Sequence, residues 1–99
     1  MVTFGELING NKPVLIHFYT QFNQPQHLLK TLRDVAASLG DKVKVVKIDI
    51  HKNEALAEAL SVDEKPTYII YKNREMKWRN VGSQDAVTLV EVIKEYISF

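Results

Sequence analysis

Apolar and polar positions along the chain alternate between the spacing of strands and that of helices. Nearly continuous apolar runs, such as the one from Val14 to Tyr19, predict strands that are buried on both faces. Apolar residues three and four apart predict helices between these runs. We expect strands over residues 14–19, 43–50, 67–71 and 75–81, and helices over residues 3–8, about 24–39, a short stretch after Asn53 and a final stretch after Ser83.

Polar residues in front of the apolar stretches predict where the helices start. Thr3 with Glu6 has the spacing of a capping box, and Asn53 and Ser83 are suitable N-caps for the two later helices. Gly40 is a typical stop for the long helix. The expected apolar faces are Leu56, Ala59 and Leu60 in the short helix, and Val87, Val90, Ile93 and Ile97 in the final one.

The order of these elements predicts an α/β domain. A helix joins the first two strands, so they should be parallel, because such a crossover returns the chain in the same direction. The last two strands are separated only by the turn at residues 72–74 and should form a hairpin. With 99 residues, the chain fits a single domain, residues 1–99.

Composition and charge exclude several classes of function. Hydrophobic residues make up 45% of the chain, as in an ordinary globular domain, and no apolar run is long enough to span a bilayer. The net charge of +1 gives no reason to expect nucleic acid or a membrane as a partner. No secretory signal is visible at the N-terminus, so the default expectation is a cytoplasmic protein.

The chain contains no cysteine, which excludes disulfides, thiolate nucleophiles and cysteine-based metal sites. His17, His27 and His51 do not have the spacing of metal ligands, and no phosphate-binding glycine loop is present. Asp49 and His51 follow a strand, where open α/β sheets bind ligands, but a solvated surface is the favoured interpretation. We therefore expect no metal and no cofactor.

Four segments in order carry a resemblance to a known family: residues 13–26, 43–50, 62–67, and 72–75 with 81–82. From about Lys12 to the end, the chain resembles thioredoxin. The resemblance implies a thioredoxin fold, with a central sheet of four, possibly five, mixed strands flanked by helices. We expect the family's short N-terminal strand to be absent or nearly so, since only Met1 and Val2 precede the first expected helix.

The departures from the family concern its redox motif. Asn23 and Gln26 stand where the two redox cysteines would be, Gln24 replaces the glycine between them, and Pro25 is kept. Other positions differ as well: His17 stands where the family has a buried Asp that assists proton transfer, Tyr19 and Phe22 where Trp is common, and Thr31 where a proline kinks the long helix.

Asn23 and Gln26 cannot replace the lost cysteines chemically, because side-chain amides neither ionise nor form mixed disulfides. They can cap a helix: Asn23 is a good N-cap, and Gln26 completes the spacing of a capping box. The favoured interpretation is therefore a structural helix start. The alternative, which can coexist with it, is that these amides line a groove and donate hydrogen bonds to a peptide.

Pro66 corresponds to the family's cis-proline, whose loop pairs with an extended peptide. The resemblance therefore implies a cis Lys65–Pro66 bond and a loop shaped for a strand-like ligand. The alternative is that this bond is simply part of the fold. Tyr19, Phe22, Pro25 and Pro66 could form an apolar patch beside it. The candidates for the peptide groove are Phe22, Asn23, Gln24, Pro25, Gln26, Lys65, Pro66 and Gly82.

His17 and Trp78 have mainly structural interpretations. His17 lies on a buried strand, and a neutral, hydrogen-bonded core histidine is favoured over a pH-sensitive group or a general base. Trp78 should pack against the final helix.

The leading functional hypothesis is a redox-inactive thioredoxin-like protein that is not an enzyme. It would bind a peptide or protein partner through the old substrate groove, as a monomer or weak homodimer. The alternative is a thiol–disulfide oxidoreductase relative whose cysteines were lost or engineered away. A purely structural subunit is a third hypothesis, since fold alone does not define a partner.

Overall fold

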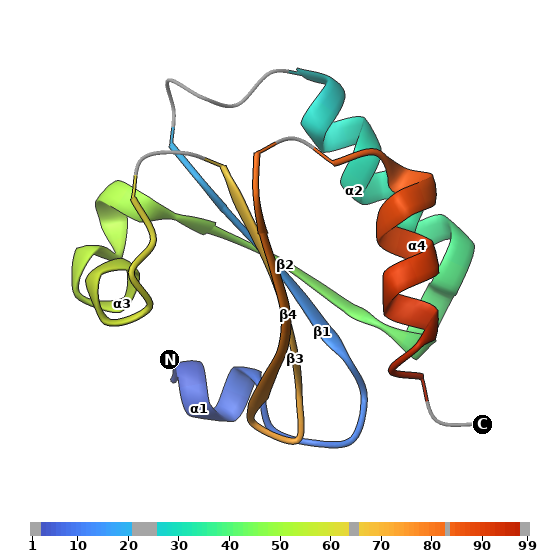
Figure 1. The fold of residues 1–99 in the computed structure, drawn as a ribbon, viewed down its shortest axis with the longest axis horizontal. Helices are drawn as coiled ribbons and strands as arrows, with labels where there is room; N and C mark the ends of the chain where they lie inside the picture. The colour runs from blue at the N-terminus through green and yellow to red at the C-terminus, as the bar shows by residue number, and fades with distance from the viewer. Residues whose placement is uncertain (1–2, 21–25, 64–65, 83, 98–99) are drawn as a thin grey trace.

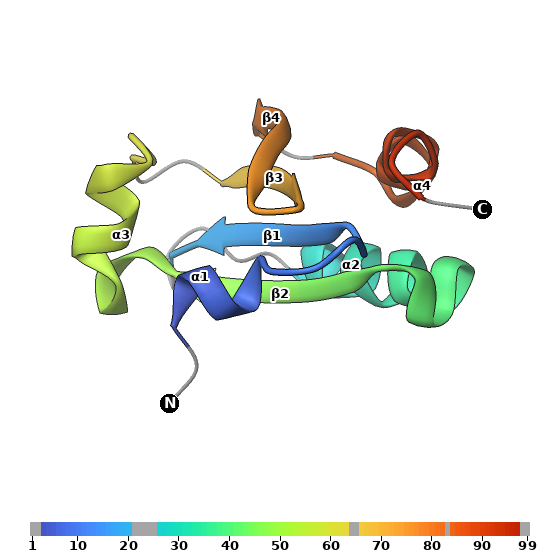
Figure 2. The same ribbon diagram turned by 90° about the horizontal axis from the view of Figure 1, so that it is seen from below.

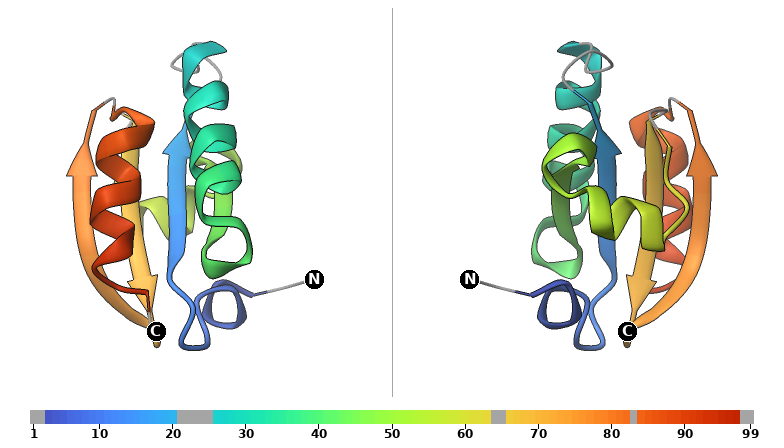
Figure 3. Two further views of the ribbon diagram at one scale, coloured as in Figure 1. Left: turned by 90° about the vertical axis from the view of Figure 1, so that its right-hand side faces the viewer. Right: turned by 90° about the vertical axis from the view of Figure 1, so that its left-hand side faces the viewer.

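The computed structural model describes residues 3–20, 26–63, 66–82 and 84–97. Its centre is a four-stranded mixed sheet in the order β2-β1-β3-β4. Helices α1 (Phe4–Leu7) and α3 (Glu54–Ala59) cover one face, and α2 (Gln26–Leu39) and α4 (Ala86–Lys94) cover the other, as Figures 2 and 3 show. The described part of the chain is thus a three-layer α/β arrangement, and the predicted order of helices and strands is confirmed.

The strands are β1 (Val14–Tyr19), β2 (Lys44–Asp49), β3 (Thr67–Lys72) and β4 (Glu75–Val81). β1 and β2 pair in parallel, and β3 pairs antiparallel with both β1 and β4. The predicted parallel pair and hairpin are both confirmed. The hairpin turn places Asn73 at φ 54° and Arg74 at φ 65°, as in a type I′ turn that matches the twist of the strands.

Helix α1 begins as the sequence predicts, because the Thr3 hydroxyl accepts a hydrogen bond from the Glu6 N–H at 3.2 Å. At α3, Asn53 occupies the N-cap, but its side chain makes no capping bond and donates instead to the Asp49 carbonyl at 2.9 Å. The predicted apolar face of α3 is also partly wrong. Ala57 is buried and Ala59 is exposed.

The start of α4 differs from the prediction. Its N-cap is Asp85, whose carboxylate accepts the Thr88 N–H at 2.8 Å, while Ser83 lies outside the described residues. The predicted apolar face is confirmed in part: Ile93 is buried and Val90 and Ile97 pack against the same cluster, whereas Val87 is 72% exposed and Leu89 is buried instead.

The sheet separates two apolar clusters. The cluster under α1 and α3 contains Ile8, Val14, Ile16, Phe18, Ile48, Ile50, Ala57, Val62, Ile69 and Tyr71. The cluster under α2 and α4 contains Leu15, Leu32, Val35, Leu39, Val43, Tyr68, Ile70, Leu89 and Ile93. Trp78 packs against this second cluster, next to residues of α4, as predicted. Alternate residues of β1 and β3 supply each cluster, because successive side chains of a strand point to opposite faces.

Candidate functional site

The candidate site lies at one end of the sheet, where β1 and β4 end and β3 begins (Figure 1). Thr67 of β3 pairs with Phe18 on one side and with Val81 on the other. Next to these paired residues, the Gly82 N–H donates to the Pro66 carbonyl at 2.7 Å. Gly82 has φ 101°, a conformation that L side chains rarely adopt. The structure thus brings together two of the predicted groove residues, Pro66 and Gly82.

The other groove candidates cannot be placed. Gln26 is the first residue of α2, and the structure does not describe its side chain. The predicted cis bond between Lys65 and Pro66 stays a prediction, because Lys65 is not described. The candidates outside the described residues are Phe22, Asn23, Gln24, Pro25 and Lys65.

Below this end of the sheet lies a buried polar pair. His17 of β1 and Tyr68 of β3 face each other across the antiparallel ladder, with 1% and 0% of their surface exposed. Their rings stack with centroids 4.6 Å apart and an interplanar angle of 13°. Neither His17 nitrogen nor the Tyr68 hydroxyl has a hydrogen-bond partner in the described structure. The expectation of a hydrogen-bonded His17 is therefore wrong, because its cross-strand neighbour is an aromatic ring.

Burial controls the charge state of this pair. Removal from water, together with a smaller effect of the nearby Lys47 ammonium, lowers the pKa of His17 from 6.5 to about 4. Burial also raises the pKa of Tyr68 to about 12. Both rings are therefore neutral at neutral pH. His17 cannot supply a negative charge, as the buried Asp that the resemblance implies at this position would.

Two more side chains extend the aromatic group toward the edge of the sheet. The Tyr19 ring lies 5.9 Å from the His17 ring, and the Lys47 ammonium lies 5.6 Å from the Tyr19 centroid, within range of a cation–π interaction. The surroundings of His17 are thus aromatic and cationic. Sequence reasoning missed Tyr68 and Lys47, because only the strand register brings them next to His17.

The described residues offer no cluster of three or more side chains that could hold a metal ion. The Asp49 carboxylate accepts the His51 N–H at 2.9 Å and so shapes the turn after β2. His51 is exposed, but Asp49 is buried, so the expectation of a solvated pair is only half right. No helix in the described part is long and apolar enough to cross a membrane.

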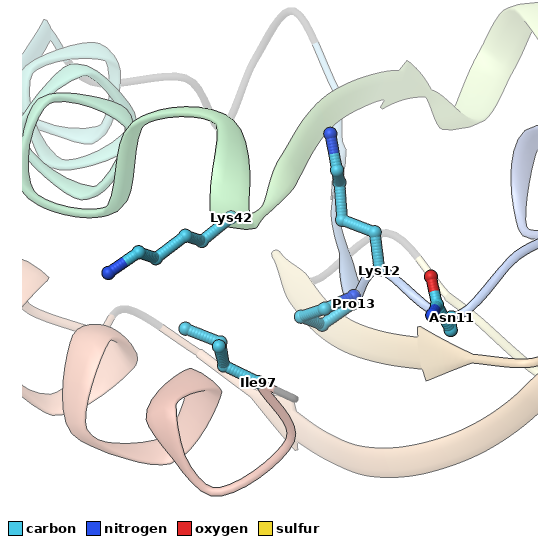
Figure 4. Close-up of a pocket in the computed structure, with 5 residues that line it drawn as sticks. All are labelled: Asn11, Lys12, Pro13, Lys42 and Ile97. Atoms are coloured by element: carbon cyan, nitrogen blue, oxygen red, sulfur yellow. The ribbon is translucent and has the colours of Figure 1, made fainter. Parts of the chain in front are cut away.

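A small pocket of about 180 Å³ lies at the opposite end of β1 and is lined by Asn11, Lys12, Pro13, Lys42 and Ile97. Figure 4 shows that its two lysine side chains extend in different directions. Because the ammonium groups do not converge, the pocket lacks the arrangement that would hold an anion.

The sheet order and the helix layers define a thioredoxin-like fold. Comparison with known proteins shows that the sequence is similar to thioredoxins as well. The sequence profile of the thioredoxin family matches residues 2–95. The chain is 37% identical to thioredoxin Y of rice (Oryza sativa), a chloroplastic protein, over 94 residues that cover 93% of the chain and 56% of the relative. It is 31% identical to a thioredoxin-like protein of Synechocystis, covering 95% of the chain and 91% of that protein.

Among solved structures, a mutant thioredoxin from Halobacterium salinarum matches with a TM-score of 0.76 and 31% identity. The match covers 90% of the chain and 78% of that protein. The chain spans about half the length of the plant relatives, 56% in rice and 52% in one Arabidopsis protein. The chain belongs to the thioredoxin family.

Proposed function

We propose that the protein is a redox-inactive member of the thioredoxin family that binds a peptide or protein partner through the surface around Pro66 and the former redox motif. The observation that carries the proposal is a family fold without any cysteine. Asn23 and Gln26 stand at the positions of the family's two cysteines, and neither side chain can attack a disulfide.

The environment of His17 supports the loss of redox chemistry. The family's buried Asp assists proton transfer at this position, and that task needs a group that gains and releases a proton near the working pH. His17 is buried, has a pKa of about 4 and stacks on Tyr68, so it stays neutral. The chain therefore differs from the family in its proton-transfer group as well as in its nucleophile.

The surface beside Pro66 supports a retained binding role. The Pro66 carbonyl accepts the Gly82 N–H, which ties the residue directly before β3 to the residue directly after β4. A backbone position that is fixed in this way loses less conformational entropy when an extended peptide binds beside it. Binding through this surface requires no thiol.

The first experiment measures redox activity as the reduction of insulin disulfides with dithiothreitol as electron donor. We expect no rate above that of dithiothreitol alone, because the chain cannot form a mixed disulfide. An active thioredoxin serves as the positive control. A rate that rises with the concentration of this protein would contradict the proposal and favour the alternative of an oxidoreductase relative.

The second experiment tests the binding surface by affinity capture with the wild-type protein and single variants. We expect Phe22→Ala and Pro66→Ala to lose the same captured partner. Pro13→Ala is the matched control, because Pro13 directly precedes the other end of β1 and lines a different pocket. Circular dichroism of each variant shows whether it is folded. A partner that folded Phe22→Ala and Pro66→Ala variants retain would argue against this surface.

A further inference from the structure

Among the described residues, β2 is the strand at one edge of the sheet. The Lys44 N–H donates to the Pro13 carbonyl at 3.0 Å, which fixes the side of β2 that faces β1. Because backbone groups alternate sides along a strand, the N–H and C=O groups of Val45 and Lys47 face away from β1. The Asp49 carbonyl lies on the same outer side and accepts a bond from the Asn53 amide at 2.9 Å. No described strand lies beyond β2.

A groove follows this edge on the α2 side of the sheet. It has a volume of about 400 Å³, and side chains of α2 and β2 line it. Those of α2 have the spacing of one helix face, and those of β2 are two residues apart and share a face of the sheet. The lining residues are Leu29, Leu32, Arg33, Ala36, Val45 and Lys47.

The groove is positively charged. Its lining includes Arg33 and Lys47 but no carboxylate. Arg33 has no hydrogen bond or ion pair with another described residue, and Lys47 lies over the Tyr19 ring. Lys30, also on α2, differs because Asp34 neutralises it at 2.8 Å. The groove therefore combines apolar side chains, two cations without a carboxylate beside them in its lining, and backbone groups that face away from β1.

We propose that this groove and edge bind an extended acidic segment of another protein, which adds to the sheet as a strand beside β2. Backbone groups of the segment would pair with Val45 and Lys47, as in other cases of strand addition. Carboxylates on its α2-facing side would pair with Arg33 and Lys47, and an apolar residue between them would contact Val45 and Ala36. This site lies on the β2 side of β1, whereas Pro66 precedes β3 on the other side.

Charge argues against a second copy of this chain as the occupant. Pairing of two β2 edges would bring Lys44 and Lys47 of one copy close to the same residues of the other. Like charges on adjacent strands destabilise the pairing, and lysines on edge strands are a common protection against it. An acidic segment reverses the sign of this interaction.

The test uses a labelled peptide, Thr-Glu-Thr-Val-Thr-Glu-Thr with blocked ends, and fluorescence anisotropy at low salt. We expect saturable binding that is at least about tenfold weaker for Arg33→Glu with Lys47→Glu, because both attractions become repulsions. Lys77→Glu is the matched control on the other edge strand and should leave the affinity unchanged. Thermal unfolding establishes that each variant is folded.

Two further peptides separate strand addition from simple charge attraction. Replacing both Glu by Lys should abolish binding. Methylating the backbone nitrogens on the β2-facing side keeps the charge but removes donors, and should weaken binding about tenfold or more. Equal binding of the methylated peptide, or of the double charge variant, would overturn the proposal, as would the absence of saturable binding by the unmodified peptide.

Discussion

The two faces of the sheet bury side chains of different character. Under α1 and α3, β1 and β3 contribute apolar residues such as Ile16, Phe18 and Ile69. Arg79 of β4 lies at the rim of this face and donates two hydrogen bonds to backbone carbonyls. Under α2 and α4, the same strands bury His17 and Tyr68, which leave three polar atoms without partners in the described structure. The described core under α1 and α3 is thus apolar, whereas the core under α2 and α4 also contains a polar pair that lowers the stability of the fold.

This difference has a physical meaning, because a buried polar group without a hydrogen bond loses its hydration and gains nothing in return. Departures of this kind are rare in folded proteins, and they tend to occur at functional or formerly functional sites. His17 of this pair is the residue that the resemblance aligns with the family's buried Asp. In the described structure, the cost of unpartnered buried polar groups therefore falls on the α2/α4 face.

The largest expected effect is a loss of stability in acid that originates at His17. Its pKa falls from 6.5 in the unfolded chain to about 4 in the folded protein, so protonation favours unfolding. The destabilisation by His17 is absent above about pH 6.5, grows as the pH falls toward 4, and then stays constant. The pKa difference corresponds to a loss of about 3 kcal/mol in the free energy of unfolding.

Urea unfolding of the wild type and His17→Leu between pH 4 and pH 7 measures this contribution. The variant should be at least as stable as the wild type at pH 7, and its advantage should grow as the pH falls. Val87→Ala is the control, since Val87 is 72% exposed and carries no titratable group, so its variant should follow the wild-type pH profile. Parallel pH profiles for wild type and His17→Leu would show that His17 is not buried in its neutral form.

A smaller effect is expected at the rim of the α1/α3 face. The Arg79 guanidinium donates to the Leu60 carbonyl and, at 2.8 Å, to the Ser61 carbonyl, at the C-terminal end of α3. Arg79→Met removes both charge-assisted bonds and should lower the free energy of unfolding by about 1–2 kcal/mol. Chemical denaturation at pH 7 measures the loss.

Two other variants test whether the stabilisation by Arg79 depends on the geometry of its guanidinium or only on its charge. Arg79→Lys should recover only part of the loss, because an ammonium cannot donate through a planar fork. Lys77→Met on the same strand removes only an exposed pair with Glu75 and should change stability little. Equal losses for Arg79→Met and Lys77→Met would mean that the bonds to α3 contribute nothing.

The periodicity of apolar residues predicts most of the fold, but it predicts only part of the difference between the two faces of the sheet. The runs 14–19 and 67–71 are strongly apolar, so their strands and burial follow directly from the pattern. The polar pair depends on which residue of β3 faces His17, and register is a long-range property that a local pattern does not contain. At α4 the pattern placed Val90, Ile93 and Ile97 on the apolar face, but it did not distinguish the exposed Val87 from the buried Leu89.

The candidate site was predicted less completely than the fold. The resemblance located Pro66 and Gly82, and the structure joins them by a hydrogen bond. The resemblance also located His17 at a buried position, but not the stacking or the missing hydrogen bonds. Those depend on Tyr68, which by sequence alone is one aromatic residue in a buried strand.

The smallest expected effect is at Tyr68 and has the opposite sign to that at Arg79. The Tyr68 hydroxyl is buried without a partner in the described structure, and burial raises its pKa to about 12. Tyr68→Phe removes the unsatisfied hydroxyl and keeps the ring stacked on His17, so it should raise the free energy of unfolding by about 1 kcal/mol. The control is Tyr71→Phe on the opposite face, whose hydroxyl is not among the unpartnered buried atoms and whose removal should not stabilise the protein. Thermal and urea unfolding at pH 7 compare the two variants directly. If Tyr68→Phe destabilises the protein, its hydroxyl has a hydrogen-bond partner in solution, and the two faces of the sheet differ less than the structure indicates.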